Sequence, residues 1–431
     1  MRIQLIIKYL LLALFLLLPS WGVISAQVNY FFGFEYLLVS FRYSIIFCII
    51  ILCLLGGIFS NLRLRNRLAF FILFFYSLYS LLHFVGDTEL ILLFEGFRHE
   101  VLFVLLAFSL LVYGLSRERS DFLPSLDIVG KTILINGFFS ALFGIWQYFD
   151  ISILETLYRS PLEEIGSIRL AIGYRLAGTM FNPINFATFL VLFFLVINYF
   201  HERRKVSFIV YYFSLILVTG LVVGSLSRLA LMSLFTVLSF IYFYKISVLR
   251  LLFFLSLIFP LMFYFFYNLD LETIMSRLET IFVLSTYTEN ARFEHWIYAI
   301  SNLEPYQYLW GKGIGASSPD YSVTSVTSAL PIENAFVSIF LQYGVFGITI
   351  LLSVVLRYIY IGCYLSKIDL AKGKFILGFL LLFIVMSLGN DFLRNSPFVL
   401  YFWFFYVYVE VNYSIIFNRQ RLLKNSTSVA R

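Results

Sequence analysis

The sequence has little charge. Only 13% of its 431 residues are Asp, Glu, Lys or Arg, whereas 61% are hydrophobic and 20% are aromatic. A soluble domain is typically about a quarter charged, so this composition excludes a soluble globular protein and indicates a chain that crosses a membrane many times. The net charge of +7 does not indicate nucleic-acid binding, because excess Lys and Arg in membrane proteins usually marks cytoplasmic loops.

Metal-ligating side chains are also scarce. The three cysteines lie within or at the edge of apolar runs, and the four histidines show no ligand spacing. We therefore expect neither a disulfide framework nor a metal site. The run from Gly311 to Gly315 lacks the preceding strand and the full spacing of a nucleotide-binding motif. It is interpreted as a flexible turn, and no cofactor is expected.

What the sequence does have is long apolar runs. They predict an all-α polytopic membrane protein, one membrane domain over residues 1–431, with about twelve transmembrane helices. The first run has a basic start and resembles a signal peptide, but it is longer than a usual signal core, which favours an uncleaved first helix. The predicted spans lie near residues 5–25, 44–60, 68–85, 100–115, 131–149, 184–200, 207–224, 229–244, 249–268, 335–356, 375–390 and 397–416.

The joints between the runs alternate in character. One set is short and basic, as in Arg203-Arg204-Lys205, and the other contains two long mixed loops, residues 150–183 and 269–334. The positive-inside rule places both termini in the cytoplasm and both long loops on the extracytoplasmic face. With this assignment the cations outside are arginines, except for Lys312. Arginine suits multidentate recognition of phosphate or carboxylate; for Arg42 and Arg98 we favour snorkelling toward the headgroups.

Three outer segments carry candidate site residues. In the first long loop, Arg169 and Arg175 precede Asn182 and Asn185 at a helix entry, so the loop is either an anion-binding lip or a solvated segment whose asparagines cap the helix. Arg228 follows a tight turn between two apolar runs, where an arginine at the membrane edge is usually paired or functional.

The second long loop begins a short helix at Arg292-Phe293-Glu294-His295-Trp296. Residues three or four apart share a helix face, so Arg292 and Trp296 are expected to face a cavity together, while His295 points elsewhere. His295 is a candidate base, although an interfacial role is more common. Glu333-Asn334 precedes the next apolar run. There a carboxylate is either part of a helix cap or a general base.

In their order along the chain, these elements resemble the O-antigen ligase and O-antigen polymerase superfamily of bacterial surface-polysaccharide assembly. The matching elements are Arg175-x-x-Gly178, Asn182-Pro183-x-Asn185, Ser227-Arg228, Arg292 before His295-Trp296, the glycines 311, 313 and 315, Glu333-Asn334, and Gly344-Val345-Phe346-Gly347. They cover most of residues 130–390, and each motif alone is degenerate.

The resemblance implies a metal-independent membrane glycosyltransferase with a GT-C-like architecture in the bacterial inner membrane. Its donor would be a glycan on undecaprenyl diphosphate, held by Arg169, Arg175, Arg228 and Arg292, which would stabilise charge on the leaving group. Glu333 or His295 would deprotonate the acceptor hydroxyl, with Asn182, Asn185, Trp296 and Asn334 in support. The implied partners are lipid-linked donor and acceptor, membrane lipids, a chain-length regulator and a flippase, with no nucleic acid.

Three functions remain open. Ligases of the family carry His-Asn where this chain has Glu333-Asn334, which favours a polymerase that builds O-antigen or capsule-type polysaccharide. The alternative is a ligase that transfers the polymer to lipid A core or another acceptor. A flippase or ion-coupled transporter for lipid-linked sugars is disfavoured, because the predicted spans are nearly free of charge.

Overall fold

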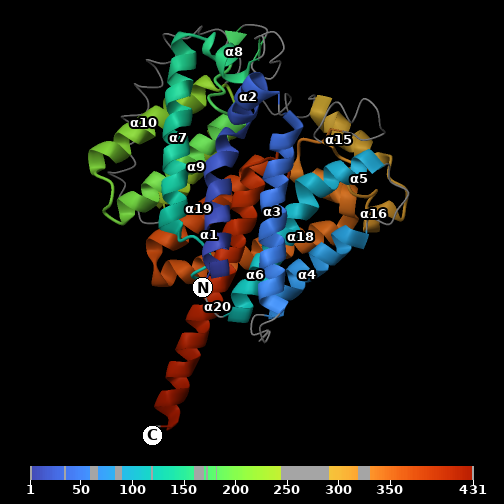
Figure 1. The fold of residues 1–431 in the computed structure, drawn as a ribbon, viewed down its shortest axis with the longest axis vertical. Coiled ribbons are helices and arrows are strands. Elements are labelled where there is room, and N and C mark those ends of the chain that lie inside the picture. Colours follow the sequence, from blue (N-terminus) through green and yellow to red (C-terminus); the bar gives the residue numbers. More distant parts are fainter. Residues whose placement is uncertain are drawn as a thin grey trace.

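The computed structural model describes residues 2–33, 35–58, 67–82, 90–117, 120–159, 169–170, 173–180, 182–243, 291–318 and 331–429. Within these ranges the chain is a bundle of helices with one two-stranded hairpin (Figure 1). The predicted span 249–268 and much of the second long loop, 269–290 and 319–330, lie outside the described residues.

The elements follow one another in a simple order. The first part of the chain forms α1 (Arg2–Leu17), η1 (Leu18–Ser20), α2 (Trp21–Phe32), α3 (Glu35–Ile58), α4 (Arg67–Leu82), α5 (Leu90–Gly96), the π-helical turn η3 (Phe97–Val101), α6 (Leu102–Arg117), α7 (Leu126–Phe149) and α8 (Ile153–Tyr158). The remainder forms β1 (Arg169–Leu170), β2 (Gly173–Tyr174), α9 (Pro183–Glu202), α10 (Phe208–Gly224), α11 (Arg228–Phe243), α15 (Ala291–Ser301), α16 (Gln307–Trp310), α18 (Ala335–Ile368), α19 (Leu370–Ser387) and α20 (Phe398–Val429).

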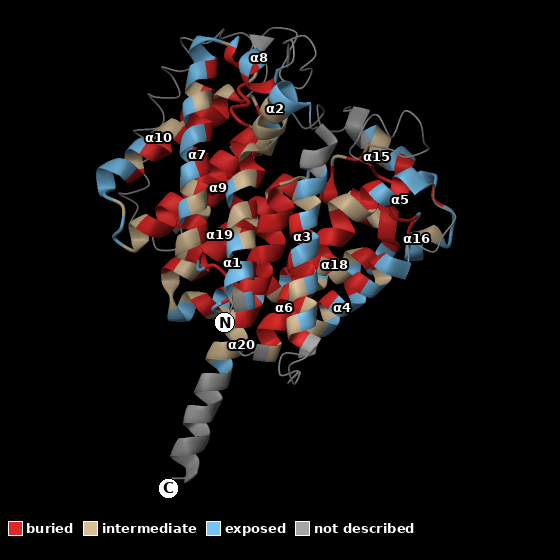
Figure 2. Cartoon of the chain, in the orientation of Figure 1, coloured by how far each residue is buried: buried red, intermediate tan, exposed pale blue. Residues whose placement is uncertain are grey.

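The helices α6, α9, α19 and α20 form the centre of the bundle. They pack on one another and on α3, α7, α11 and α18, and Figure 2 shows their buried residues concentrated in the middle of the molecule. Residues 398–411 of α20 are all buried. A helix that is hydrophobic on every side belongs in the interior, which explains the aromatic run Phe402-Trp403-Phe404-Phe405 at this position.

The predicted spans agree well with the helices. In the part of the chain that the structure describes, eight helices are long and apolar enough to cross a membrane, and three shorter apolar helices, Leu68–Leu82, Phe208–Gly224 and Arg228–Tyr242, match three further predicted windows. The chain is therefore a polytopic α-helical membrane protein. The first span is bent at η1, where Pro19 lies at the start of the turn and removes a backbone donor.

Two predicted boundaries are wrong because the hydropathy windows ended at charged residues. The fourth span begins at Leu90 rather than at residue 100, and α18 continues past Arg357 to Ile368. In both cases the charge has a partner inside the bundle: Arg98 pairs with Glu95 at 2.6 Å, and Arg357 pairs with the buried Glu410 at 2.8 Å. Because the charge is paired, the helix can continue past it inside the bundle. The premise that the spans are nearly charge-free is also wrong.

The two ends of the molecule carry different elements. Figure 1 shows the N-terminus and the C-terminal end of α20 at one end, and α8 and α15 at the other. We call the end that carries α8 and α15 the outer end. The basic joint after α9 lies beside the starts of α7 and α19, where Lys205 lies 2.5 Å from Asp127 and Lys374 lies 2.5 Å from Glu202.

Candidate functional site

The loop after β2 is held on the outer end of α7 by one side chain. The Gln147 amide donates to the Arg175 carbonyl at 2.8 Å, and its oxygen accepts from the backbone N–H groups of Ala177 and Gly178 at 2.8 and 3.1 Å. Gly178 has φ +52° and stands so close to Phe186 that a Cβ would clash with the ring. Only glycine fits this turn without strain, which accounts for the spacing Arg175-x-x-Gly178.

The same loop pairs with the turn between α10 and α11. The Arg175 Nε donates to the Ser225 carbonyl at 2.9 Å, and the Leu176 N–H donates to the Gly224 carbonyl at 3.2 Å. Arg228 begins α11 three residues after Ser225, and both arginines are half-buried. The fold therefore brings Arg175 and Arg228, which are 53 positions apart in the sequence, into adjoining turns at the outer end.

Two asparagines of the motifs, Asn182 and Asn334, cap helices with their side chains. The Asn182 side chain caps α9 by accepting from the N–H groups of Ile184 and Asn185, and Asn334 caps α18 by accepting from Phe336 and Val337. This is the capping interpretation of Asn182, and such caps stabilise a helix by ~1 kcal/mol. Asn185 does not cap; its side-chain oxygen accepts from Asn390 at 3.2 Å.

The turn between α19 and α20, residues 388–397, joins the two capped helix mouths. Asn390 contacts Asn185 at the start of α9, and the Leu388 carbonyl accepts from the Asn334 amide at 2.9 Å. Glu333 precedes this cap; it is half-buried, with one carboxylate oxygen shielded from solvent. The mouths of α9 and α18 thus lie around one short turn that sequence reasoning missed.

A buried polar network lies under that turn. Arg394 is 1% exposed; its Nε lies 2.6 Å from the Glu100 carboxylate, and its two terminal nitrogens donate to Ser317 and to the Gln342 side chain. Glu100 also accepts from the Gln342 amide at 2.7 Å and from the Tyr343 hydroxyl at 2.9 Å. The network ties η3, residues 313–318, α18 and the turn 388–397 together.

Asp391 lies beside this network. It is 3% exposed and 3.8 Å from an Arg394 nitrogen. Burial raises the pKa of Asp391 to about 7, and the nearby Glu100 carboxylate adds to this, while Arg394 opposes it. A carboxyl that titrates near neutral pH beside a candidate site fits proton-transfer chemistry. In the sequence, Asp391 was marked only by its position with Arg394 between the last two apolar runs.

The glycine run Gly311–Gly315 is not a flexible turn. Its backbone docks onto a break in α18 at Gly344, which has φ +60°. The Lys312 N–H donates to the Leu341 carbonyl at 2.7 Å, and the Gly313 N–H donates to Gln342 at 3.1 Å. These bonds satisfy carbonyls that the break frees. A Cβ at Gly311 would meet the Gln342 carbonyl oxygen at 2.1 Å, so the glycines are needed for packing.

Trp296 lies on the face of α15 that packs against α18, and its position on a cavity shared with Arg292 remains a prediction. It packs with Ala299 and Ile300 of α15, and with Leu303 just after that helix, against Val337 and Phe340 of α18. This apolar face of α15 contacts a neighbouring helix because its spacing repeats every turn. His295, the neighbour of Trp296 on α15, is half-buried.

Of the four predicted diphosphate-binding arginines, two have side chains that the structure describes. Arg175 and Arg228 are brought together, as above. Arg169 pairs with Tyr174 in the β1–β2 hairpin, and Arg292 lies in the first turn of α15, one turn before Trp296. The side chains of Arg169 and Arg292 lie outside the described part of the structure. Their roles remain predictions.

Residues 213–352 match the family model described as O-Antigen ligase. Over this segment the chain is similar to that family, which supports its resemblance to the O-antigen ligase and polymerase superfamily. The match runs from α10 to the middle of α18 and includes Arg228, Arg292, His295 and Glu333. Members of this superfamily are membrane glycosyltransferases of the ligase type. No curated protein matches the chain. The Arg175 loop and the Glu100–Arg394 network lie partly or wholly outside the matched segment.

Proposed function

We propose that this protein polymerises undecaprenyl-diphosphate-linked oligosaccharide repeat units into O-antigen or capsule-type polysaccharide on the extracytoplasmic face of the bacterial inner membrane. The observation that carries the proposal is the pairing of the Arg175 loop with the turn before Arg228, through Arg175 and Ser225. It gathers two arginines from separate segments at the outer end of a GT-C-like helical bundle.

The arginines bind the donor through its diphosphate. Each guanidinium presents several N–H donors in a planar fork, which matches phosphate oxygens, and each charge-assisted hydrogen bond contributes about 1.5–3 kcal/mol. The same contacts stabilise the negative charge that develops on the leaving diphosphate. Arg169 and Arg292 complete the set in this proposal.

The transfer moves one glycosyl group. The hydroxyl oxygen of the acceptor sugar forms a bond to the anomeric carbon of the donor, and the bond from that carbon to the diphosphate oxygen breaks. Undecaprenyl diphosphate leaves with the bonding electron pair, and Glu333 accepts the proton of the hydroxyl. The position of Glu333 at the mouth of α18, before the Asn334 cap, supports its role as the general base.

The second candidate function is a ligase that passes finished polymer to lipid A core or another acceptor. The description of the matched family, O-Antigen ligase, favours it, whereas Glu333-Asn334 in place of His-Asn favours the polymerase. A flippase fits less well. It needs a cationic path through the bundle, whereas the arginine inside α18, Arg357, is paired with Glu410 of α20.

The surface glycan of a deletion strain separates these functions. Loss of a polymerase leaves a single repeat unit on the usual anchor. Loss of a ligase leaves polymer on the lipid carrier, and loss of a flippase leaves unpolymerised lipid-linked units on the cytoplasmic face. Complementation with the wild-type chain and with Arg228→Ala, at equal amounts in the membrane, checks that the phenotype depends on the proposed site. An unchanged glycan would overturn the proposal.

A further inference from the structure

Two arginines outside the matched segment converge on one tyrosine. The Arg42 guanidinium carbon lies 4.4 Å from the centre of the Tyr43 ring, and that of Arg98 lies 5.9 Å from the same ring. Arg42 also lies 5.9 Å from the centre of the Trp21 ring. Four elements, α2, α3, α5 and η3, thus build one cluster, which we call the Arg42 cluster: Trp21, Arg42, Tyr43, Glu95, Arg98 and His99.

The Arg42 cluster has more positive than negative charge. Arg98 is 2.6 Å from the Glu95 carboxylate, and the His99 Nε2 is 3.3 Å from the same group. Arg42 donates to the Tyr43 hydroxyl; in the part of the chain that the structure describes, no carboxylate lies within ion-pair distance of it. Among the described residues, the cluster thus holds two guanidinium groups and one carboxylate, which pairs with Arg98 alone of the two arginines, and its net charge is positive.

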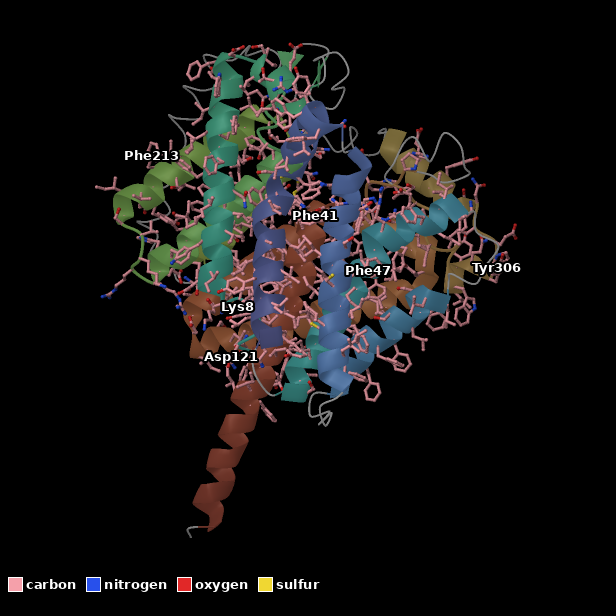
Figure 3. All side chains as sticks on the ribbon, in the orientation of Figure 1. Lys8, Phe41, Phe47, Asp121, Phe213 and Tyr306 are labelled. Carbon is pink, nitrogen blue, oxygen red and sulfur yellow. The ribbon has the colours of Figure 1, made fainter. Side chains whose placement is uncertain are left out.

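The cluster lies inside the outer edge of the membrane-spanning segments. Arg42 is the third residue of the span Ser40–Gly57, and Arg98 is in the span Leu90–Ser116. Figure 3 shows Phe41, the residue before Arg42, in the half of α3 toward the outer end. Arginine within a membrane span is costly and usually marks a functional site. Arg98 also lies in a π-helical turn, a distortion frequent at such sites.

Simple snorkelling, the role expected from the sequence, does not fit these side chains. A snorkelling arginine extends its head group into water. Here the Arg42 head group lies over two rings, and the Nε atoms of Arg42 and Arg98 are both shielded from solvent, with no hydrogen-bond partner among the described residues. Buried donors are normally satisfied. The Arg98 side chain remains 22% exposed, so a ligand can reach the cluster.

The Arg42 cluster is continuous with the network beneath the candidate site. The His99 Nδ1 lies 3.3 Å from the carbonyl oxygen of Arg394, and Arg394 belongs to the turn that contacts the mouths of α9 and α18. A lipid held at Arg42 would therefore have its head group beside the candidate site while its chain remained in the bilayer.

We propose that Arg42 and Arg98 form a second anion site, which binds the diphosphate of the other lipid-linked saccharide in the transfer. This inference rests on the proposed function, because a polymerase must hold two lipid-linked substrates at once. The Arg175–Arg228 site takes one diphosphate, and the Arg42 cluster takes the second.

Native mass spectrometry of the full chain in nanodiscs tests the proposal, with undecaprenyl diphosphate as the probe. The wild-type chain is expected to bind two molecules. Arg42→Gln, Arg98→Gln and Arg228→Gln are each expected to bind one, with the affinity of the lost molecule reduced at least tenfold. The control is Arg159→Gln, which removes an outer-end arginine that lies over Tyr30; it is expected to bind two.

The outcomes separate this proposal from the proposed function. Two molecules bound to both Arg42→Gln and Arg98→Gln would overturn the second site. A single molecule on the wild-type chain, lost only in Arg228→Gln, would also overturn it and leave the proposed function intact. If Arg228→Gln binds two while Arg42→Gln binds one, the second site stands and the Arg228 assignment fails.

Two further arms close the test. One arm uses phosphatidylglycerol nanodiscs with an excess of the probe. If the wild-type chain still keeps a bound phospholipid and Arg42→Gln does not, the cluster is a phospholipid site and the proposal is overturned. If Arg42→Gln does not assemble, Arg42→Lys replaces it, since it keeps the charge but loses the planar fork. At least tenfold weaker binding of the second molecule then supports the proposal, and unchanged binding overturns it.

Discussion

The Arg394 Nε lies 2.6 Å from the Glu100 carboxylate, and both side chains are buried. They are 294 positions apart in the sequence, and their pairing connects η3 to the turn between α19 and α20. The same arginine donates to Ser317, which follows the glycine run. Through its ion pair and this hydrogen bond, Arg394 connects three segments around the candidate site.

Removal of one partner of this pair is expected to destabilise the fold strongly. Arg394→Met leaves the Glu100 carboxylate buried without its ion-pair partner, at a cost of about 3–5 kcal/mol. The double variant Glu100→Gln with Arg394→Met is expected to recover much of that loss, because no buried charge remains. Thermal unfolding in detergent measures both. Equal melting temperatures for wild type and Arg394→Met would contradict the role of the pair.

Asp391 makes stability depend on pH. Its folded pKa, about 7, is above its unfolded value of 3.8, so the folded state binds the proton more tightly. The stabilisation from protonation is complete below the unfolded pKa and is lost as pH rises through about 7. The melting temperature of the wild-type chain should therefore fall between pH 5 and 8. Asp391→Asn should flatten this dependence; an identical slope in both proteins would show that another group titrates.

Loss of the outer arginines should abolish long polymer. Arg292→Ala removes a proposed diphosphate ligand, and Arg175→Ala also removes the hydrogen bond to Ser225 that holds two turns together. We expect polymer length to collapse to single repeat units in both, as glycan electrophoresis of complemented strains would reveal. Arg159→Ala, matched in charge and in its place at the outer end, should retain wild-type length. Long polymer in Arg292→Ala would exclude it from the clamp.

Glu333 and its neighbour Asn334 should give different phenotypes. Glu333→Gln is expected to lower the transfer rate at least a hundredfold while donor binding is unchanged, because it removes the base. Asn334→Ala removes the α18 cap and the bond to Leu388, so it should lower stability by about 1 kcal/mol with a smaller effect on rate. Initial rates and melting temperatures of the purified variants measure both. A fully active Glu333→Gln would limit Glu333 to a structural role at the helix mouth.

The sidedness can be tested by cysteine labelling from outside intact cells. From the sequence, Ser317 in the second long loop is a position for the label. In the structure it is buried and hydrogen-bonded to Ser338 and Arg394. Glu304, which is exposed and precedes α16, is the better position. In a chain without its three native cysteines, Glu304→Cys should react with an impermeant maleimide before lysis. Reaction only after lysis would mean that the topology is inverted.

The order of the apolar helices that the structure describes could be predicted from the sequence, because a run of apolar residues long enough to span the bilayer has few alternatives. The glycines and capping asparagines of the motifs were also visible, since their conformations are local. Hydropathy failed at Glu95, Glu100 and Arg357, because a window cannot show that each charge meets a partner: Arg98 one turn along the same span, Arg394 in the turn between α19 and α20, and Glu410 on α20.

The sequence by itself therefore determined the class of protein, the alternation of basic joints and long loops, and the outer arginines as candidates. Only the tertiary structure decided which residues contact one another: Arg175 with the turn before Arg228, Asn185 with Asn390, and Glu100 with Arg394. It also turned a glycine run expected to be flexible into the packing element that closes the break in α18. The physical reason is that pairing of buried charges and backbone groups depends on which helices pack together, and that is a property of the whole bundle.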